Sequence, residues 1–198
     1  SLGFDFPGLV KELIAGGWPA DLATSAALEG YRGNLRMFDA LMTMVQANAA
    51  FTGGTVLVAA AGNESKRNID PNHEIGVSIP AAANDIVSVG ALESTPAGLK
   101  IASFSNTGPI ISGPGVKITS AKAGGGLVDF NGTSMATPHV AGCAALWWEE
   151  LGALGVPVTA ANVIAKLRGS AATDKFAAGV DLDDRGVGMV RAPAARTV

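Results

Sequence analysis

Three stretches of the chain are apolar almost throughout and end at turn-forming residues. The first, residues 55–61 (TVLVAAA), runs into a Gly-Asn pair. A continuous apolar run of this length is typical of a parallel strand that is buried on both faces. Residues 85–92 (DIVSVGAL) and 115–121 (GVKITSA) are bounded by Pro, Gly or Asn and predict two more strands, with a turn-rich connector, ASFSNTGP, between them.

Apolar residues spaced three or four apart predict helices that alternate with these strands. In residues 34–50 the apolar stripe consists of Leu35, Phe38, Met42, Val45 and Ala49. In residues 133–151 it consists of Val140, Ala144, Trp147 and Leu151. Thr159 is a suitable N-cap for a further helix that reaches Leu167. Strands and helices that alternate with short loops predict an α/β fold with a mostly parallel sheet.

Residues 4–33 differ from this pattern and contain two short helical stretches broken by Gly-Gly-Trp-Pro. No residue combination in this segment indicates chemistry. The segment is either an insertion packed on the surface or one wall of a binding cleft. We favour the surface insertion, because long insertions cost little stability.

Composition and charge narrow the range of functions. The 198 residues are 48% hydrophobic and only 16% charged, so the chain is either buried on several sides or a piece of something larger. The net charge of −3 gives no broad basic field for nucleic acid or an anionic membrane, and no apolar run approaches the ~18 residues of a membrane span. The single cysteine, Cys143, excludes an internal disulfide framework.

The stretch NGTSMATPHVAG, residues 131–142, carries the strongest functional signal. It resembles the nucleophile motif of the subtilases, G-T-S-M-A-x-P-H-V-A-G, and every specified position is filled. The resemblance implies a three-layer subtilisin-like fold with Ser134 as the catalytic nucleophile. The expected helix begins at this serine, and its unpaired N–H groups and positive dipole end favour the negative charge that acyl transfer develops.

A second stretch, AAAGNES at residues 59–65, resembles the subtilase strand whose tip carries the oxyanion-hole asparagine. That role falls on Asn63, whose side-chain amide would donate to the oxyanion together with the Ser134 N–H. Taken by itself, an asparagine at the end of a strand is a common turn residue. Its order in the chain relative to the serine motif favours the catalytic interpretation.

The resemblance also implies a primary specificity pocket. One wall is a strand that ends in Ser1, Leu2 and Gly3 and pairs with the substrate backbone. The opposite side is formed by small residues and by the start of the serine helix, namely Ala60, Ala61, Gly62 and Thr133, with a base near Ser78. Small walls leave space for a large apolar side chain, whereas Glu64 at the rim would favour a basic one.

A serine becomes an effective nucleophile only when a base accepts its proton, and subtilases supply acid, base and serine in the order Asp, His, Ser. His139 lies five residues after Ser134, about 140° around the helix, and His73 follows the strand of Asn63. Neither matches the family's base. We therefore expect residues 1–198 to be the C-terminal part of a subtilase catalytic domain with an atypical helical insertion at about 4–33. The acid and base are then expected in an N-terminal half, and this part alone would be a poor hydrolase.

The expected function is that of a serine endopeptidase that forms an acyl-enzyme on Ser134. Its expected partners are a polypeptide substrate and the N-terminal half of the same protein, and we expect it to bind neither nucleic acid nor membrane. A non-catalytic subtilase-fold binding module is the alternative. An unrelated esterase is disfavoured because no G-x-S-x-G elbow surrounds the serine. We expect no metal or other cofactor, although the resemblance allows a structural calcium bound by backbone carbonyls near residues 81–86. The resemblance also favours a secreted protein.

Overall fold

The structure, a computed structural model, describes residues 3–195 and is organised around strand β2 (Val87–Thr95). Strand β1 (Val58–Ala60) and strand β4 (Ile111–Pro114) both pair parallel with β2, while β3 (Gly98–Ile101) folds back antiparallel on its last residues. Since β1 and β4 both pair with Val89, they occupy opposite edges of β2. The sheet has four strands and is mostly parallel, as the sequence predicts.

Six helices accompany the strands over the described residues. In chain order they are α1 (Phe6–Ala15), α2 (Ala20–Ala47), α3 (Ala49–Thr52), α4 (Thr133–Ala153), α5 (Ala160–Ser170) and α6 (Leu182–Arg185). Thr159 caps α5, because its hydroxyl accepts the N–H of Asn162 at 3.2 Å, which confirms the predicted N-cap. Within residues 3–195, no helix is long and apolar enough to cross a membrane.

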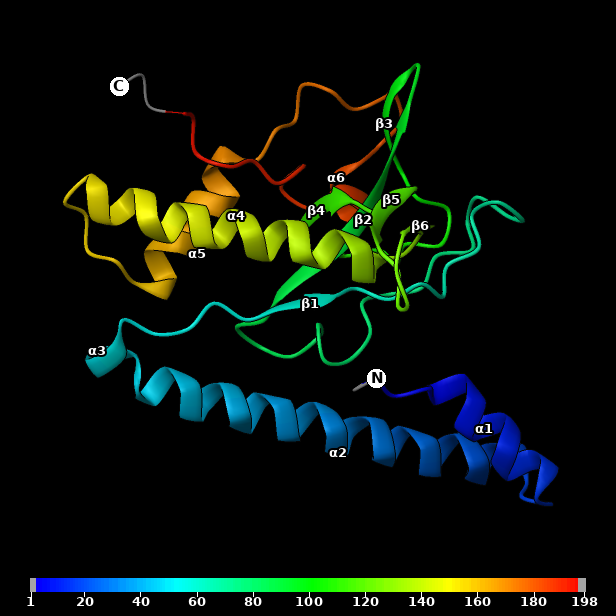
Figure 1. Cartoon of the computed structure of the whole chain (residues 1–198). Coiled ribbons are helices and arrows are strands. Elements are labelled where there is room, and N and C mark those ends of the chain that lie inside the picture. Colours follow the sequence, from blue (N-terminus) through cyan, green and yellow to red (C-terminus); the bar gives the residue numbers. More distant parts are fainter. Residues whose placement is uncertain (1–2, 196–198) are drawn as a thin grey trace.

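Two hydrophobic clusters join the elements into three layers. Val89 and Ile111 of the sheet pack with Val140 and Leu151 of α4 and with Val163 of α5. On the other side, the partly buried β1 contacts a second cluster that contains Phe38 and Met42 of α2 together with Ile79, Ala83 and Ile86. The sheet therefore lies between α4 and α5 on one side and α2 on the other (Figure 1).

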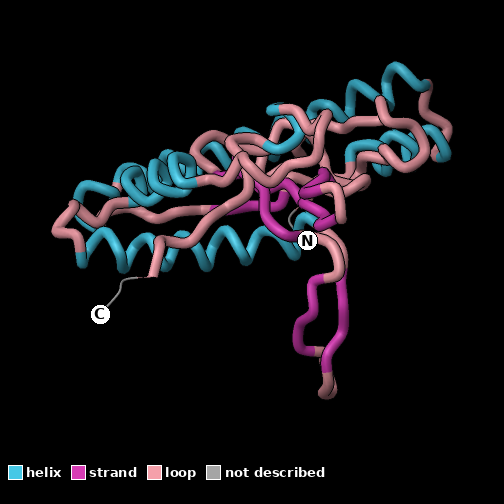
Figure 2. Tube along the Cα trace, turned by 90° about the horizontal axis from the view of Figure 1, so that it is seen from above, coloured by secondary structure: helices cyan, strands magenta, loops and turns pink. Residues whose placement is uncertain are grey.

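The predicted strand at 115–121 exists but lies outside this sheet. Its residues 118–121 form β5 (Ile118–Ala121), which pairs antiparallel with β6 (Leu127–Phe130) in a separate two-stranded hairpin that projects from the body (Figure 2). The second parallel neighbour of β2 is instead β4, whose short Ile-Ser-Gly-Pro sequence does not predict a strand. Gly113 lets β4 approach α4 closely, since a Cβ there would lie 3.0 Å from the carbonyl oxygen of Ala136.

The predicted helix at 34–50 begins earlier than expected. α2 starts at Ala20, so the second helical stretch of residues 4–33 and the predicted helix are one continuous element. Two glycines inside it disfavour this helix in isolation, by about 1 kcal/mol each. Packing compensates at Gly30, where a Cβ would lie 3.0 Å from the ring of Phe4. Tertiary contact thus decides a boundary that local propensity leaves open.

Candidate active site

The serine motif lies at the start of α4, where the N–H of Ser134 is unpaired as expected, whereas those of Thr133, Met135 and Ala136 have partners. Over the described residues 3–195, no acceptor is bonded to the backbone N–H of Ser134, and its side chain is exposed without a hydrogen bond. Pro138 inside α4 has no N–H, so the Ser134 carbonyl lacks its usual helical partner. The 21-residue helix directs the positive end of its dipole at this residue.

Asn63, in the loop that follows β1, is tied to the residue before the serine. Its Oδ1 accepts the backbone N–H of Thr133 at 2.8 Å and the Thr133 hydroxyl at 2.9 Å. Since a backbone N–H can only donate, the oxygen of the Asn63 amide must face Thr133 and the Nδ2 group must face away. The Thr133 hydroxyl accepts the N–H of Gly62 at 3.3 Å, and Thr133 is completely buried.

The two candidate oxyanion donors converge on one point in space. A Cβ built on Gly132 would lie 3.4 Å from the Met135 Sδ, 3.7 Å from the Ser134 N and 3.8 Å from the Asn63 Nδ2. Because residue 132 is glycine, this position holds no side chain. The backbone N–H of Ser134 and the side-chain amide of Asn63 thus lie beside the same point, near the exposed serine.

Asn106, which the sequence analysis did not single out, holds the loop that carries Asn63. It is fully buried in the connector between β3 and β4. Its Oδ1 accepts the backbone N–H groups of Glu64 and Ser65 at 3.0 and 3.1 Å, and its Nδ2 donates to the Ala61 carbonyl at 3.2 Å. The same Nδ2 lies 3.1 Å from the carbonyl oxygen of Gly76. Nothing in the sequence distinguishes Asn106 from an ordinary turn asparagine.

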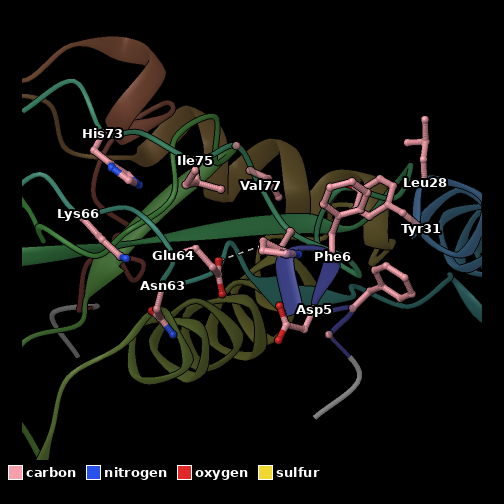
Figure 3. A pocket seen from close by; sticks show the side chains of 15 residues that line it. Asp5, Phe6, Leu28, Tyr31, Asn63, Glu64, Lys66, His73, Ile75 and Val77 are labelled. Carbon is pink, nitrogen blue, oxygen red and sulfur yellow. Dashed lines mark hydrogen bonds between the residues drawn. The ribbon is translucent and has the colours of Figure 1, made fainter. Parts of the chain in front are cut away.

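An open cavity of about 1030 Å³ extends from Asn63 along this loop (Figure 3). Of the pocket residues proposed from sequence, Gly3 and Ser78 line it, whereas Ser1 and Leu2 lie outside the described residues. Ala60, Ala61, Gly62 and Thr133 are not among its lining residues, and Ala61 and Thr133 are fully buried. Their part in substrate binding stays a prediction.

Gly62 has a packing requirement of its own. Its φ is +113°, and a Cβ there would collide with the side chains of Asn106, Glu64 and Ser78. The Glu64 carboxylate is turned toward the same place, accepting from Asn106 Nδ2 at 2.6 Å and from Ser78 Oγ at 3.1 Å. It is therefore engaged with the cavity wall rather than free at the rim.

Neither histidine is hydrogen-bonded to the serine. The Nδ1 of His139 lies 2.8 Å from the carbonyl oxygen of Met135, one turn earlier in α4, and so carries the proton of that hydrogen bond. His73 lines the cavity, and no hydrogen bond joins it to Ser134.

Burial raises the pKa of the Cys143 thiol, which lies further along α4. Among residues 3–195, no group of three His, Cys, Asp or Glu is arranged to hold a metal ion.

A family model described as the subtilase family matches residues 25–189, more than half of the chain. The chain belongs to the subtilase family. Among characterised subtilases, it is 43% identical over 101 residues to a thermostable alkaline protease of Halalkalibacterium halodurans, which covers 50% of this chain and 25% of that protein. It is also 43% identical over 109 residues to subtilisin amylosacchariticus of Bacillus subtilis subsp. amylosacchariticus, covering 54% of the chain and 26% of that protein.

Solved subtilase structures agree with the fold. The patellamide maturation protease PatA superposes with a TM-score of 0.55 at 27% identity, over 85% of this chain and 53% of that one. The prenylagaramide maturation protease PagA superposes with a TM-score of 0.59 over 96% of this chain and 66% of that one, and at 22% identity it supports the fold alone. The matched region is thus about a quarter of the length of the two characterised relatives and half to two thirds of these structures.

Proposed function

We propose that the protein is a serine endopeptidase in which Ser134 forms the acyl-enzyme and Asn63 helps to bind the oxyanion. The observation that supports this proposal is the proximity of the Asn63 Nδ2 and the Ser134 N, which both lie within 4 Å of the Cβ position of Gly132. Donors fixed before the reaction stabilise charge that develops only in the transition state, and they need no reorganisation at that moment. The double hydrogen bond from Thr133 supplies that fixation.

In the proposed reaction, the Ser134 Oγ attacks the carbonyl carbon of a peptide bond while a base accepts the hydroxyl proton. The carbonyl oxygen takes the negative charge and receives hydrogen bonds from the Asn63 amide and the Ser134 N–H. The intermediate then breaks its C–N bond, the amine leaves with the proton from the base, and water hydrolyses the resulting ester. Since no imidazole is hydrogen-bonded to Ser134 within residues 3–195, we propose that residues outside this part supply the base and its orienting acid.

Labelling with a fluorophosphonate serine-hydrolase probe tests the proposal. We expect the full-length protein to be labelled at Ser134, Ser134→Ala to lose the label, and both proteins to melt at the same temperature. The 198-residue chain alone should be labelled poorly, and efficient labelling of it would contradict the need for an outside base. An unlabelled, folded full-length protein would overturn the proposal and favour a subtilase fold retained for binding. Secretion stays a prediction from the family resemblance.

A further inference from the structure

Arg67 lies four residues after Asn63 in the same loop, and its side chain is turned into the protein. Only 12% of this side chain is exposed. Its Nη2 lies 2.5 Å from Oδ1 of Asp184 in α6, its Nη1 donates to the carbonyl oxygen of Ser105, and its Nε donates to Oε1 of Glu74 at 3.3 Å. One guanidinium thus joins the loop to two segments that are 38 and 117 positions away in the chain.

The connector between β3 and β4, which receives Arg67, also holds the start of the loop. Ser105 is followed by Asn106, whose Oδ1 accepts the backbone N–H groups of Glu64 and Ser65. The contact is mutual, because the Asn106 side chain binds the loop backbone and the Arg67 side chain binds the connector backbone. Two adjacent residues of the connector therefore hold the loop at two points.

The segment from Asn63 to Arg67 is bonded along its whole length. Besides the two backbone donors that are bonded to the connector side chain, the N–H groups of Lys66 and Arg67 donate to the carbonyl oxygens of His73 and Ser103, both at 3.0 Å. Buried backbone groups are costly to leave unpaired. A displacement of Arg67 therefore moves the segment as a whole, and Asn63 lies at its start.

Asp184 is a fixed anchor, because α6 is itself attached to the connector. The N-cap residue Asp181 accepts the N–H of Asp184 at 3.0 Å. The carbonyl oxygen of Asp183 accepts the N–H of Gly108 at 2.7 Å and the hydroxyl of Thr107 at 3.2 Å. The Asp184 side chain is 15% exposed, so loss of its partner would leave a charge with little water around it.

We infer that Arg67 is a positioning residue for the oxyanion site, which anchors the loop to the connector and to α6 and so sets the place of the Asn63 amide. This inference rests on the proposed function, because Asn63 bears on the reaction only if it binds the oxyanion. The guanidinium is bonded to three protein acceptors, so its effect on the reaction passes through Asn63. Lysine is a poor substitute, since its ammonium is a point charge and lacks the planar fork.

A double-mutant cycle in the full-length protein tests the inference, because residues that act through one another have non-additive effects. Arg67→Met removes the donors and keeps a long side chain. We expect it to lower kcat on a peptide substrate about 10-fold with little change in KM, since a misplacement of about 1 Å can cost about 10²-fold. In the Asn63→Leu background the same substitution should change kcat less than about 2-fold, because no amide is left to position.

Arg191→Met is the matched control. It removes an arginine whose side chain is 53% exposed and whose ion pair with Asp174 spans 3.7 Å, so it should leave kcat unchanged in both backgrounds. Arg67→Lys keeps the charge and should lower kcat by a smaller factor than Arg67→Met, again only where Asn63 is present. Thermal melting checks that each variant is folded, and Arg67→Lys carries the cycle if Arg67→Met does not fold.

The outcomes separate this inference from the proposed function. If Ser134 of the wild type reacts with the fluorophosphonate probe and the folded Arg67 variants keep the wild-type kcat, the inference is overturned and the proposed function stands. An equal fold loss in kcat with and without Asn63 also overturns it, because a purely structural role predicts that result. If the folded wild type is not labelled, the proposed function fails, and the role of Arg67 in positioning the oxyanion site fails with it.

Discussion

Thr133 donates both its backbone N–H and its hydroxyl to Oδ1 of Asn63, at 2.8 and 2.9 Å. The two residues are 70 positions apart in the chain, one in the loop after β1 and the other at the first turn of α4. The pair fixes the orientation of the Asn63 amide and the distance between the loop and the helix. A change at either residue therefore acts on the geometry beside Ser134.

Replacing the candidate oxyanion donor should slow the chemical step. For Asn63→Leu we expect kcat on a peptide substrate to fall with little change in KM, because the lost hydrogen bond forms in the transition state. Subtilisin is itself the reference case for losing such a donor, at about 10²–10³-fold in kcat, and we adopt that range from it. Asn68→Leu, in the same loop and exposed, serves as control and should keep full activity. An unchanged kcat in Asn63→Leu would exclude the role.

Thr133→Val should have a smaller effect of the same kind. The variant keeps the backbone donor to Asn63 but loses the hydroxyl donor, and it leaves the Gly62 N–H without its acceptor. We expect kcat to fall about 10-fold and the free energy of unfolding to fall by about 1–3 kcal/mol, the usual cost of an unpaired buried polar group. Thr133→Ser retains the hydroxyl and should recover most of kcat. If the serine variant is as slow as the valine variant, the hydroxyl is not what orients Asn63.

Removal of the Asn106 side chain should lower the stability of the protein. Asn106→Leu leaves the N–H groups of Glu64 and Ser65 and the carbonyl of Ala61 without their partner. We expect the free energy of unfolding, from urea denaturation, to fall by about 3 kcal/mol or more, within the range for disrupted buried networks. Asn84→Leu, an exposed asparagine substitution, should stay within about 0.5 kcal/mol of wild type. Equal stability of the two variants would show that Asn106 does not hold the loop.

The Cys143 thiol should react slowly in the folded protein. Burial raises its pKa, so the reactive thiolate is a smaller fraction of the thiol at pH 8 than for a free cysteine. We expect alkylation by iodoacetamide at pH 8 to be several-fold slower in the folded protein than in guanidinium chloride, and the folded-state rate to keep rising above pH 9. Equal rates in the two states at pH 8 would contradict a raised pKa.

Much of the candidate site was predictable because its residues are contiguous in the sequence. The serine motif from Gly132 to Gly142 predicts the position of α4, since a glycine precedes the first helical turn and an apolar stripe follows it in the chain. The run that ends in Asn63 likewise predicts β1. Asn106 was missed because its importance lies in partners between 30 and 45 positions away. Single-residue propensity carries no information about such partners.

The sequence by itself determined the family, the strands β1 and β2 and the N-cap of α5, because local periodicity and motif spacing are properties of neighbouring residues. Only the tertiary structure decided that residues 115–121 leave the main sheet, that α2 begins at Ala20, and that Leu28 and Tyr31 of this helix line a cavity with Asn63. Each of these outcomes depends on which apolar surfaces meet after the chain has folded. Burial between distant segments outweighs the weak local preferences of a short strand or a glycine-containing helix.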